Sequence, residues 1–221
     1  MLTVWSIRGY RCFRWRHGGC SAHGYNEPMS GSDHVKPATP GVKLTYDDFV
    51  LFPEDGMRHE LIDGEHYVTA SPNMRHQQIS MNLVLLVGNW LERHPVGRLF
   101  HAPFDVVFSK YDVVEPDLLY VSRERSNVLT APNVQGAPDL VIEIGSPSTR
   151  RRDETIKRRL YERSDVLEYW IVDPDIEVVR VCRRSGDSFA RPAELSREAD
   201  DVITTNLMPG LELPLARIFR E

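Results

Sequence analysis

The sequence predicts an α/β fold in which a central mixed β-sheet is flanked by helices. Three observations support this class: a long amphipathic segment precedes three strand-like runs, a second helical segment follows them, and two further strand-like runs come last. At 221 residues, with 41% hydrophobic and 27% charged residues, the chain has the composition of one ordinary globular domain with a tail.

Residues 1 to 40 differ from the rest of the chain. Prolines and glycines interrupt them without a sustained apolar period, so we expect a flexible N-terminal extension over 1–40 and one domain over 41–221. The early arginines are not followed by the apolar run of a secretory signal. A structural zinc protein is an alternative, although the spacing of the available ligands differs from common zinc sites: Cys12, His17, Cys20 and His23.

A short helix and a hairpin are the first ordered elements expected. Thr45 and Asp48 have the spacing of a helix cap, which predicts a short helix directly after Thr45. Asp63-Gly64 is a turn pair typical of β-hairpins, and strand-like runs flank it over His59 to Ile62 and His66 to Thr69. We therefore expect a hairpin as an N-terminal extension of the sheet core.

A long helix is predicted from Arg75 to about Arg93. Its apolar residues recur at spacings of four, three and four, which places them on one face, and Pro95 ends the pattern. These apolar residues are Ile79, Leu83, Leu86 and Trp90.

Three extended runs predict the central strands. Each is rich in β-branched or aromatic residues and bounded by turn-forming residues; the runs are Arg98 to Phe108, Asp117 to Val121 and Asp139 to Ile144. A second helix is predicted over Asp153 to Arg163, with an apolar stripe formed by Ile156 and Leu160.

A second hairpin and an apolar tail complete the chain. Tyr169 to Val172 and Val178 to Val181 flank a turn at Asp173-Pro174-Asp175, and Tyr169 and Trp170 are expected in the core. Apolar residues after Val202 are expected to pack at an edge or an interface: Leu211, Leu213, Leu215 and Ile218.

Composition limits the possible functional classes. The net charge of −5 gives no general attraction to nucleic acid, so any such contact must come from local charge. Cys12, Cys20 and Cys182 are too few for a disulfide framework, which favours a reducing compartment, and we expect the cytoplasm. The longest apolar run, Leu83 to Val87, is too short to cross a membrane, so no membrane association is expected.

Two carboxylates interrupt segments that otherwise have core character. Glu143 lies inside an apolar strand, where its charge needs a compensating partner, and Asp117 begins another predicted strand after Pro116. Adjacent strands would bring both oxygens together, and one or two carboxylates suffice for Mg²⁺, with Mn²⁺ possible. The alternatives are a turn-capping role for Asp117 and a structural ion pair between Glu143 and an arginine.

Lys157 and Glu60 are the other candidates for catalysis. Lys157 lies at the edge of the buried face of the second helix, from which its ammonium could reach the two carboxylates, and Glu60 lies in the early hairpin. The scheme is metal-assisted phosphodiester hydrolysis, with Lys157 orienting water or stabilising negative charge. Lys157 could instead pair with Asp153 on its own helix, and Glu60 could simply be solvated.

A basic run adjoins this proposed site. Arginines there could hold the backbone of a nucleic acid without reading its sequence, although a solvated surface is the alternative: Arg150, Arg151, Arg152 and Arg158. His76 is expected to form a hydrogen bond or cap a helix, because no histidine follows four residues later to make a metal pair.

Several ordered motifs over residues 44 to 183 carry a family resemblance. They resemble the Uma2 family of restriction-endonuclease-like proteins. The motifs are Glu60-Leu61-Ile62-Asp63-Gly64-Glu65, Ser71-Pro72 with His76, Glu115-Pro116-Asp117-Leu118, Gly136 to Ile144, Ser146-Pro147-Ser148-Thr149, Asp153 with Lys157 and Tyr161, and Glu168 to Pro174.

The resemblance implies a fold and a chemistry. The family is similar to the PD-(D/E)XK nucleases, which implies Asp117 and Glu143 as metal ligands and Glu60 as an upstream acidic residue near the metal. Gly145 stands where that superfamily usually has its lysine, so the resemblance assigns the lysine role to Lys157. The implied function is a Mg²⁺-dependent DNA endonuclease.

Two further expectations accompany this function. A symmetric homodimer is expected, because each active site cuts one strand and duplex DNA offers two. The alternative is a catalytically inactive nuclease-fold module that binds nucleic acid or protein, since a fold does not guarantee an activity.

Overall fold

The structure is a computed structural model that describes residues 42–53, 55–146 and 149–221. These residues belong to one compact unit, Asp33–Glu221. The predicted extension over 1–40 lies outside the described residues, as does the alternative zinc site on Cys12, His17, Cys20 and His23.

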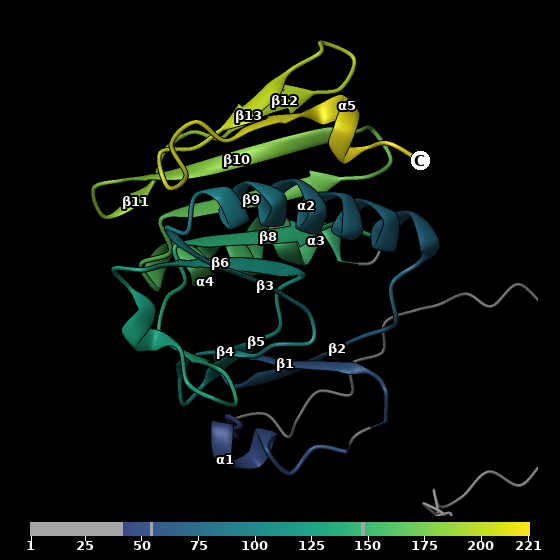
Figure 1. The fold of residues 1–221 in the computed structure, drawn as a ribbon. Coiled ribbons are helices and arrows are strands. Elements are labelled where there is room, and N and C mark those ends of the chain that lie inside the picture. Colours follow the sequence, from purple (N-terminus) through teal and green to yellow (C-terminus); the bar gives the residue numbers. More distant parts are fainter. Residues whose placement is uncertain (1–41, 54, 147–148) are drawn as a thin grey trace, which may run out of the picture. The chain divides into compact units, whose positions relative to one another are not determined.

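Within the described residues, a seven-stranded mixed sheet forms the centre of the fold (Figure 1). In spatial order its strands are β11 (Ser188–Phe189), β10 (Val178–Ser185), β9 (Glu168–Asp173), β8 (Leu140–Ile144), β6 (Leu118–Ser122) and β3 (Gly97–His101), with β12 (Ala193–Ser196) also paired to β10. Strands β8 and β9 run parallel, and the other neighbours are antiparallel. The predicted hairpin around Asp173-Pro174-Asp175 is confirmed as β9 and β10.

A smaller sheet faces the large one. Its five described strands, in order, are β2 (Glu65–Thr69), β1 (Arg58–Ile62), β5 (Asp112–Val114), β4 (Val106–Ser109) and β7 (Val134–Gln135). The predicted first hairpin is confirmed as β1 and β2, with Asp63 and Gly64 both at positive φ in the turn. A separate two-stranded sheet pairs β13 (Val202–Thr204) with β14 (Glu212–Pro214).

Helices lie on both faces of the large sheet, α2 on one and α4 on the other (Figure 1). The helical segments are α1 (Tyr46–Phe49), α2 (Met74–Arg93), η1 (Ser126–Val128), α3 (Arg150–Arg152), η2 (Asp153–Lys157), α4 (Arg158–Arg163) and α5 (Leu215–Ile218). The predicted cap is present, because the backbone N–H of Thr45 donates to the Asp48 carboxylate over 2.8 Å. Helix α2 confirms the long predicted helix.

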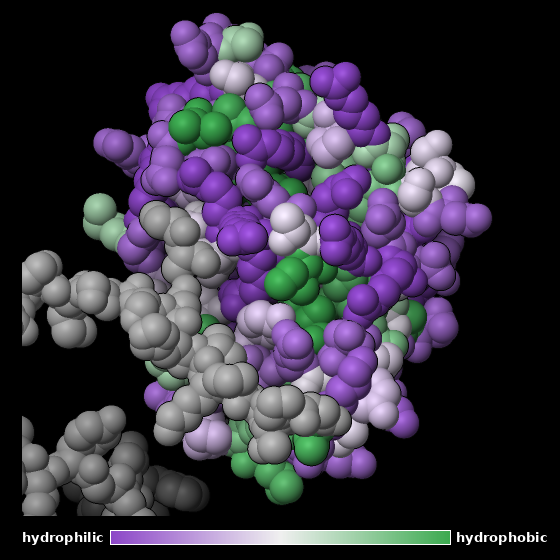
Figure 2. Space-filling model, turned by 180° about the vertical axis from the view of Figure 1, so that it is seen from behind, coloured by the Kyte–Doolittle hydropathy of each residue, from purple (hydrophilic) through white to green (hydrophobic). Residues whose placement is uncertain are grey.

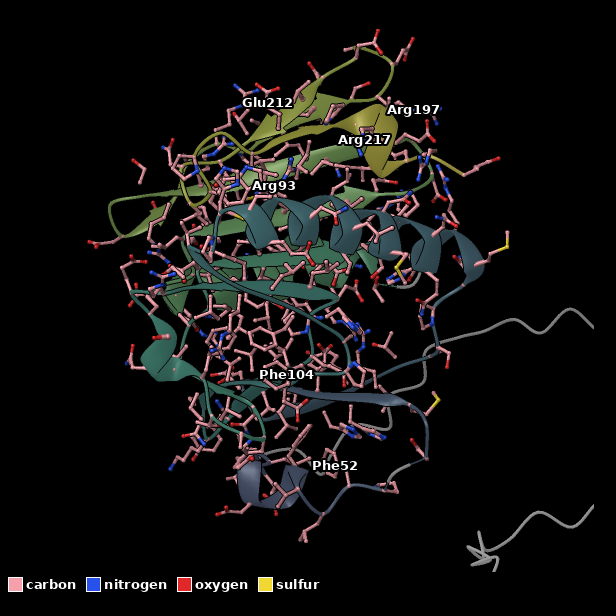
Figure 3. The ribbon with its side chains drawn as sticks, in the orientation of Figure 1. Phe52, Arg93, Phe104, Arg197, Glu212 and Arg217 are labelled. Carbon is pink, nitrogen blue, oxygen red and sulfur yellow. The ribbon has the colours of Figure 1, made fainter. Side chains whose placement is uncertain are left out.

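Alternation along the central strands divides the apolar residues into two cores. Leu118 and Tyr120 of β6 pack towards α2, whereas Leu119 and Val121 pack towards the smaller sheet and α4. Phe104 also belongs to this second layer and lies between the two sheets (Figure 3). The large sheet is therefore buried on both faces.

The C-terminal tail packs against the α2 core. Its predicted apolar residues are all buried there, so the tail covers one face of the large sheet: Leu211, Leu213, Leu215 and Ile218. Tyr169 and Trp170 are fully buried, as predicted, and point into opposite cores.

Two predicted elements are wrong in detail. The run from Arg98 to Phe108 is not one strand but β3 and β4 in different sheets, because Pro103 has no N–H for a continuous ladder. The second helix begins at Arg150 and contains a π-helical turn, η2. Ile156 is exposed, and the buried stripe consists instead of Asp153, Lys157, Leu160 and Tyr161.

In the described part of the chain, no helix combines the length and the apolar character needed to span a membrane. The face of the molecule seen in Figure 2 is largely hydrophilic, and its hydrophobic patches are separated by polar residues.

Candidate active site

Strand pairing brings the two predicted metal ligands together. Leu118 of β6 lies opposite Ile142 of β8, so in this antiparallel pair the next positions outward are Asp117 and Glu143. Alternation directs both side chains to the face of the large sheet that meets the smaller sheet. The register of this strand pair therefore places two residues that are far apart in the sequence side by side.

The first hairpin supplies two more side chains from the opposite layer. Arg58, Glu60 and Ile62 alternate along β1 and share one face, and Ile62 packs in the core between the sheets. Glu60 is completely buried, and its Oε1 accepts the backbone N–H of Glu115 at 3.1 Å. The hairpin therefore points Arg58 and Glu60 towards the large sheet.

Lys157 connects the two layers. Its Nζ lies 2.7 Å from Oε1 of Glu60 and 2.9 Å from Oε1 of Glu143. The hydroxyl of Tyr161 donates to the same Glu143 oxygen over 2.6 Å. Lys157 ends the π-helical turn, and π-turns inside helices are frequent at functional sites. The predicted residues Glu60, Glu143 and Lys157 therefore share one buried cluster.

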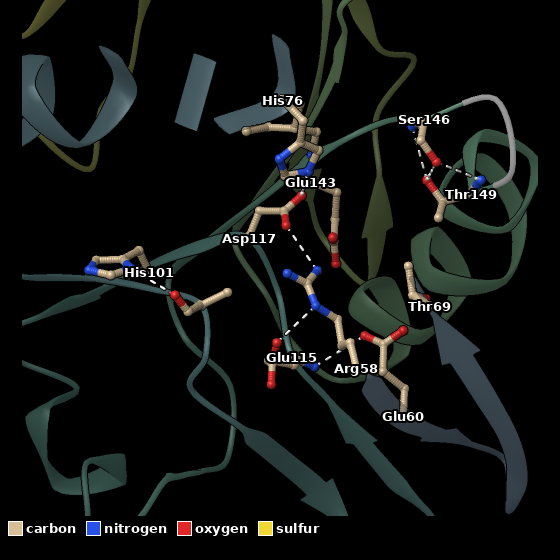
Figure 4. Close-up of polar contacts among 12 residues, drawn as sticks. Arg58, Glu60, Thr69, His76, His101, Glu115, Asp117, Glu143, Ser146 and Thr149 are labelled. Carbon is tan, nitrogen blue, oxygen red and sulfur yellow. Dashed lines mark hydrogen bonds and ion pairs between the residues drawn. The ribbon is translucent and has the colours of Figure 1, made fainter. Parts of the chain in front are cut away.

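Asp117 has its own set of donors beside this cluster (Figure 4). Nη1 of Arg58 lies 2.9 Å from Oδ1, while Nε2 of His76 lies 3.0 Å from Oδ2. The backbone N–H of Ile144 donates to Oδ2 over 2.8 Å. Nε of Arg58 pairs with Glu115 at 2.8 Å, so Arg58 bridges two carboxylates.

Several of these side chains line a pocket of about 150 Å³. Most of the residues that line it are polar or charged. The charged or titratable ones are Arg58, His76, Asp117, Glu143, Arg152, Asp153 and Lys157. Such a pocket suits a small charged group rather than a large apolar ligand.

Charge pairing keeps Asp117 and Lys157 ionised despite their burial. Burial acts to raise the pKa of Asp117, but the His76 hydrogen bond and the Arg58 charge outweigh it and hold the pKa at about 2. Burial acts to lower the pKa of Lys157, but Glu143 and Glu60 outweigh it and hold that pKa above its usual range.

The other carboxylates respond to burial in different ways. For Glu60, the charges of Lys157 and Arg152 outweigh burial, and the pKa is lowered. For Glu143, burial prevails over the Lys157 charge, and the pKa is raised. Burial also raises the pKa of Asp153 to about 7. The cluster therefore holds more acidic groups than its nearby cations fully compensate.

The predicted arginines separate into different surroundings. Arg152 lines the pocket, donates to Thr69 over 2.6 Å and lies 3.7 Å from Glu60. Arg150 pairs with Asp173 and Asp175 instead. Arg151 is exposed, while Arg158 lies over the Phe189 ring with Glu162 at 3.9 Å. Only Arg152 of these four is among the residues that line this pocket.

Three residues at the site had no role assigned from the sequence, although Asp153 and Tyr161 stand with Lys157 in one of the family motifs. Arg58 could have been found from its alternation with Glu60 on one strand face. Asp153 could have been found from its position four residues before Lys157, a spacing that shares a helix face. Tyr161 lies four residues after Lys157, so the same spacing places it on this helix face, from which its hydroxyl reaches Glu143.

The residues present fit a divalent cation that keeps much of its water. Among the residues that the structure describes, no three His, Cys, Asp or Glu side chains form a ready metal cage. Asp117 and Glu143 nevertheless line the same pocket, and Mg²⁺ usually takes one or two carboxylates. Oδ1 of Asp153 is buried there without a hydrogen-bond partner among the described residues, which adds unpaired acidic character.

The fold resembles that of a solved nuclease-like protein. A crystal structure described as "a putative nuclease belonging to DUF820 from Anabaena variabilis ATCC 29413" matches with a TM-score of 0.68 at 22% identity, covering 80% of this chain and 97% of that chain. The type IIG restriction endonuclease BpuSI matches at a TM-score of 0.36 and 10% identity, over 65% of this chain and 15% of that chain. No curated protein matches this chain. The first similarity confirms the predicted restriction-endonuclease-like fold.

Comparison of the sequence with a family model identifies the family. The model of Uma2, described as "Putative restriction endonuclease", matches residues 46–216. This range covers most of the chain, which therefore belongs to the Uma2 family, as its motifs predicted.

Proposed function

We propose that this protein is a metal-dependent endonuclease that hydrolyses DNA phosphodiester bonds. Asp117 and Glu143 would hold Mg²⁺, with Mn²⁺ as a possible substitute, and Glu60 and Lys157 would complete the catalytic set. The observation that carries the proposal is Lys157, buried between Glu60 and Glu143 in the pocket that Asp117 also lines.

The chain's own residues would have different roles in the reaction. A bound cation supplies Lewis acidity and a lowered pKa for an attacking water. Lys157 is held charged and is placed to stabilise negative charge on a phosphate oxygen or to orient water. Glu60 fixes the ammonium from one layer, and Tyr161 fixes Glu143 from the helix.

DNA binding would use the arginines beside the pocket. Arg152 lies at the pocket wall, with Arg150 and Arg151 before it and Arg158 after it on the same helical segment, where they would contact phosphates without base readout. We further propose a homodimer, because two sites are needed to cut both strands of a duplex, and a cytoplasmic location.

A second candidate is an inactive nuclease-fold module that binds nucleic acid or protein. It is favoured by the donors around Asp117, because Arg58, His76 and the Ile144 N–H engage both of its carboxylate oxygens. An arrangement of this kind would persist in a module that no longer binds a cation.

Supercoiled plasmid separates the two candidates. Purified wild-type protein should nick or linearise it with Mg²⁺ or Mn²⁺ but not with EDTA, and Glu143→Gln and Lys157→Met should abolish cutting. Arg159→Gln serves as the matched control, because Arg159 is an exposed cation on the same helix. Cutting by all variants alike would indicate a contaminant, and no cutting by any would favour the inactive module.

A further inference from the structure

We propose that Arg58 and a divalent cation compete for Asp117, so that Arg58 is a positioning residue that controls loading of the site. This inference rests on the proposed cation site at Asp117 and Glu143. It concerns a residue that the sequence patterns did not assign to the active site.

The contacts of Arg58 place its guanidinium where a cation would be needed. Nη1 lies 2.9 Å from Oδ1 of Asp117, and Nε lies 2.8 Å from Oε1 of Glu115. Figure 4 shows the guanidinium between these carboxylates and directed towards Glu143. The charges of Asp117 and Glu143 both help to raise the pKa of Arg58 against the effect of burial.

The other carboxylate oxygen of Asp117 is already occupied by hydrogen bonds. Oδ2 already accepts from His76 and from the backbone N–H of Ile144. A cation that binds Asp117 between the sheets would therefore approach Oδ1, the oxygen that Arg58 holds. Two positive groups a few ångströms apart in a buried site repel strongly, so both cannot bind that oxygen well.

The structure provides a place for the Arg58 side chain once a cation has displaced it from Asp117. A second pocket of about 350 Å³ lies beside the first, and both are lined by Arg58, Thr69, Ala70, Ser71 and Pro72. Glu115 lines only the second pocket, so a guanidinium that keeps Glu115 can leave Asp117 by turning towards that side. The exchange then needs a change of side-chain rotamer and no movement of β1.

Manganese affinity measured by isothermal titration calorimetry tests the competition. After treatment with EDTA and its removal, Arg58→Gln should bind Mn²⁺ about tenfold or more tightly than wild type, since a charged hydrogen bond no longer opposes it. Arg152→Gln is the matched control, because Arg152 lines the same pocket but lies beside Glu60. General electrostatics alone predicts similar gains for both variants, which would overturn the proposal.

A second variant covers the case in which Arg58→Gln does not fold. Arg58→Met keeps an unbranched apolar stem but removes the charge and the bond to Asp117. Competition predicts tighter Mn²⁺ binding by Arg58→Met than by wild type, whereas unchanged or weaker binding would contradict it.

Asp117→Asn distinguishes failure of this inference from failure of the proposed function. The substitution should weaken Mn²⁺ binding in the wild-type and Arg58→Gln backgrounds. If Asp117→Asn changes the Mn²⁺ affinity in neither background, the proposed cation site itself is wrong. If it weakens both while Arg58→Gln and Arg152→Gln have equal effects, the site stands and only the competition fails.

Discussion

At the scale of single residues, Lys157 explains why the site can hold two buried acidic groups from different sheets. Its ammonium lies within 2.9 Å of Glu143 and 2.7 Å of Glu60. Removing one member of a buried charge cluster is costly because the remaining charges stay desolvated. The residue that we propose for catalysis is therefore also a structural connection between the layers.

Replacing Lys157 should affect stability and activity together. We expect Lys157→Met to lower the free energy of unfolding by about 3–5 kcal/mol at neutral pH, because Glu60 and Glu143 then face each other. We expect cleavage to fall by about 10²-fold or more in folded protein. Urea unfolding and plasmid cleavage measure the two effects. Arg159→Met should change neither, and a stable Lys157→Met protein with full activity would contradict both expectations.

Asp153 should give the protein a measurable pH dependence. Its pKa is raised to about 7 by burial, so the folded protein holds this proton more tightly than the unfolded chain. The contribution of this proton to the free energy of unfolding is fully present below the ordinary aspartate pKa and is lost as pH rises through about 7. Asp153→Asn should therefore gain stability relative to wild type between pH 5 and pH 8, by a few kcal/mol.

Urea unfolding at both pH values, with EDTA present, measures this difference. Asp187→Asn, in an exposed turn, is the matched control. The same pH-dependent gain in both variants would show that Asp153 is not its source.

The sequence was informative for acidic residues inside apolar segments and less so for their partners. Glu143 stands out because four apolar neighbours in its strand cannot compensate its charge. Arg58 lies in an exposed-looking polar stretch, and its contact with Asp117 spans 59 positions of sequence, a distance that no local pattern encodes. Residue type therefore predicted which groups need partners but not which partners they find.

At the scale of elements, the first hairpin sets the positions of Arg58 and Glu60. Its turn requires φ of +54° at Asp63 and +75° at Gly64, a combination that Asp-Gly pairs adopt readily. The chain also packs closely there, because a Cβ on Gly64 would lie 2.6 Å from Cβ of Lys43. The turn thus couples the hairpin to the segment that precedes α1.

Gly64→Ala should destabilise the protein more than Gly56→Ala. Both glycines have positive φ, at +75° and +79°, but a Cβ on Gly56 would meet no atom within 4 Å. We expect losses of about 2–4 kcal/mol and about 1–2 kcal/mol respectively, because only the first combines backbone strain with overpacking. Urea unfolding measures both, and equal losses would show that the close approach to Lys43 is relieved without cost.

Elements were predictable where local signals agreed with their surroundings. Helix α2 and both hairpins have strong apolar periods or turn pairs, and they form as predicted. The predicted apolar stripe of the second helix is wrong because Ile156 is apolar but exposed, while Asp153 and Lys157 are charged but buried. Its buried face meets a polar pocket, so the usual rule that apolar residues face inward fails at that element.

At the scale of the whole molecule, the large sheet separates two kinds of interior. The side covered by α2 and the C-terminal tail is an apolar core that includes Phe219. The side that faces the smaller sheet combines apolar residues with the charged cluster around Glu143. Substitutions on the α2 side should therefore lower stability without removing the proposed chemistry, whereas substitutions in the charged cluster act on the chemistry directly.

Phe219→Ala and Tyr161→Phe test this separation. Phe219 is fully buried on the α2 side, so its truncation should cost about 3–5 kcal/mol of stability while cleavage at low temperature is retained. Tyr161→Phe removes one hydroxyl that donates to Glu143, so it should cost about 1–2 kcal/mol but lower cleavage and Mn²⁺ affinity. Thermal unfolding, cleavage and calorimetry on both variants give the comparison. If Phe219→Ala disturbed Mn²⁺ binding as much as Tyr161→Phe, the two faces would be coupled through the sheet, and rigidity of the α2 core would itself be part of the site.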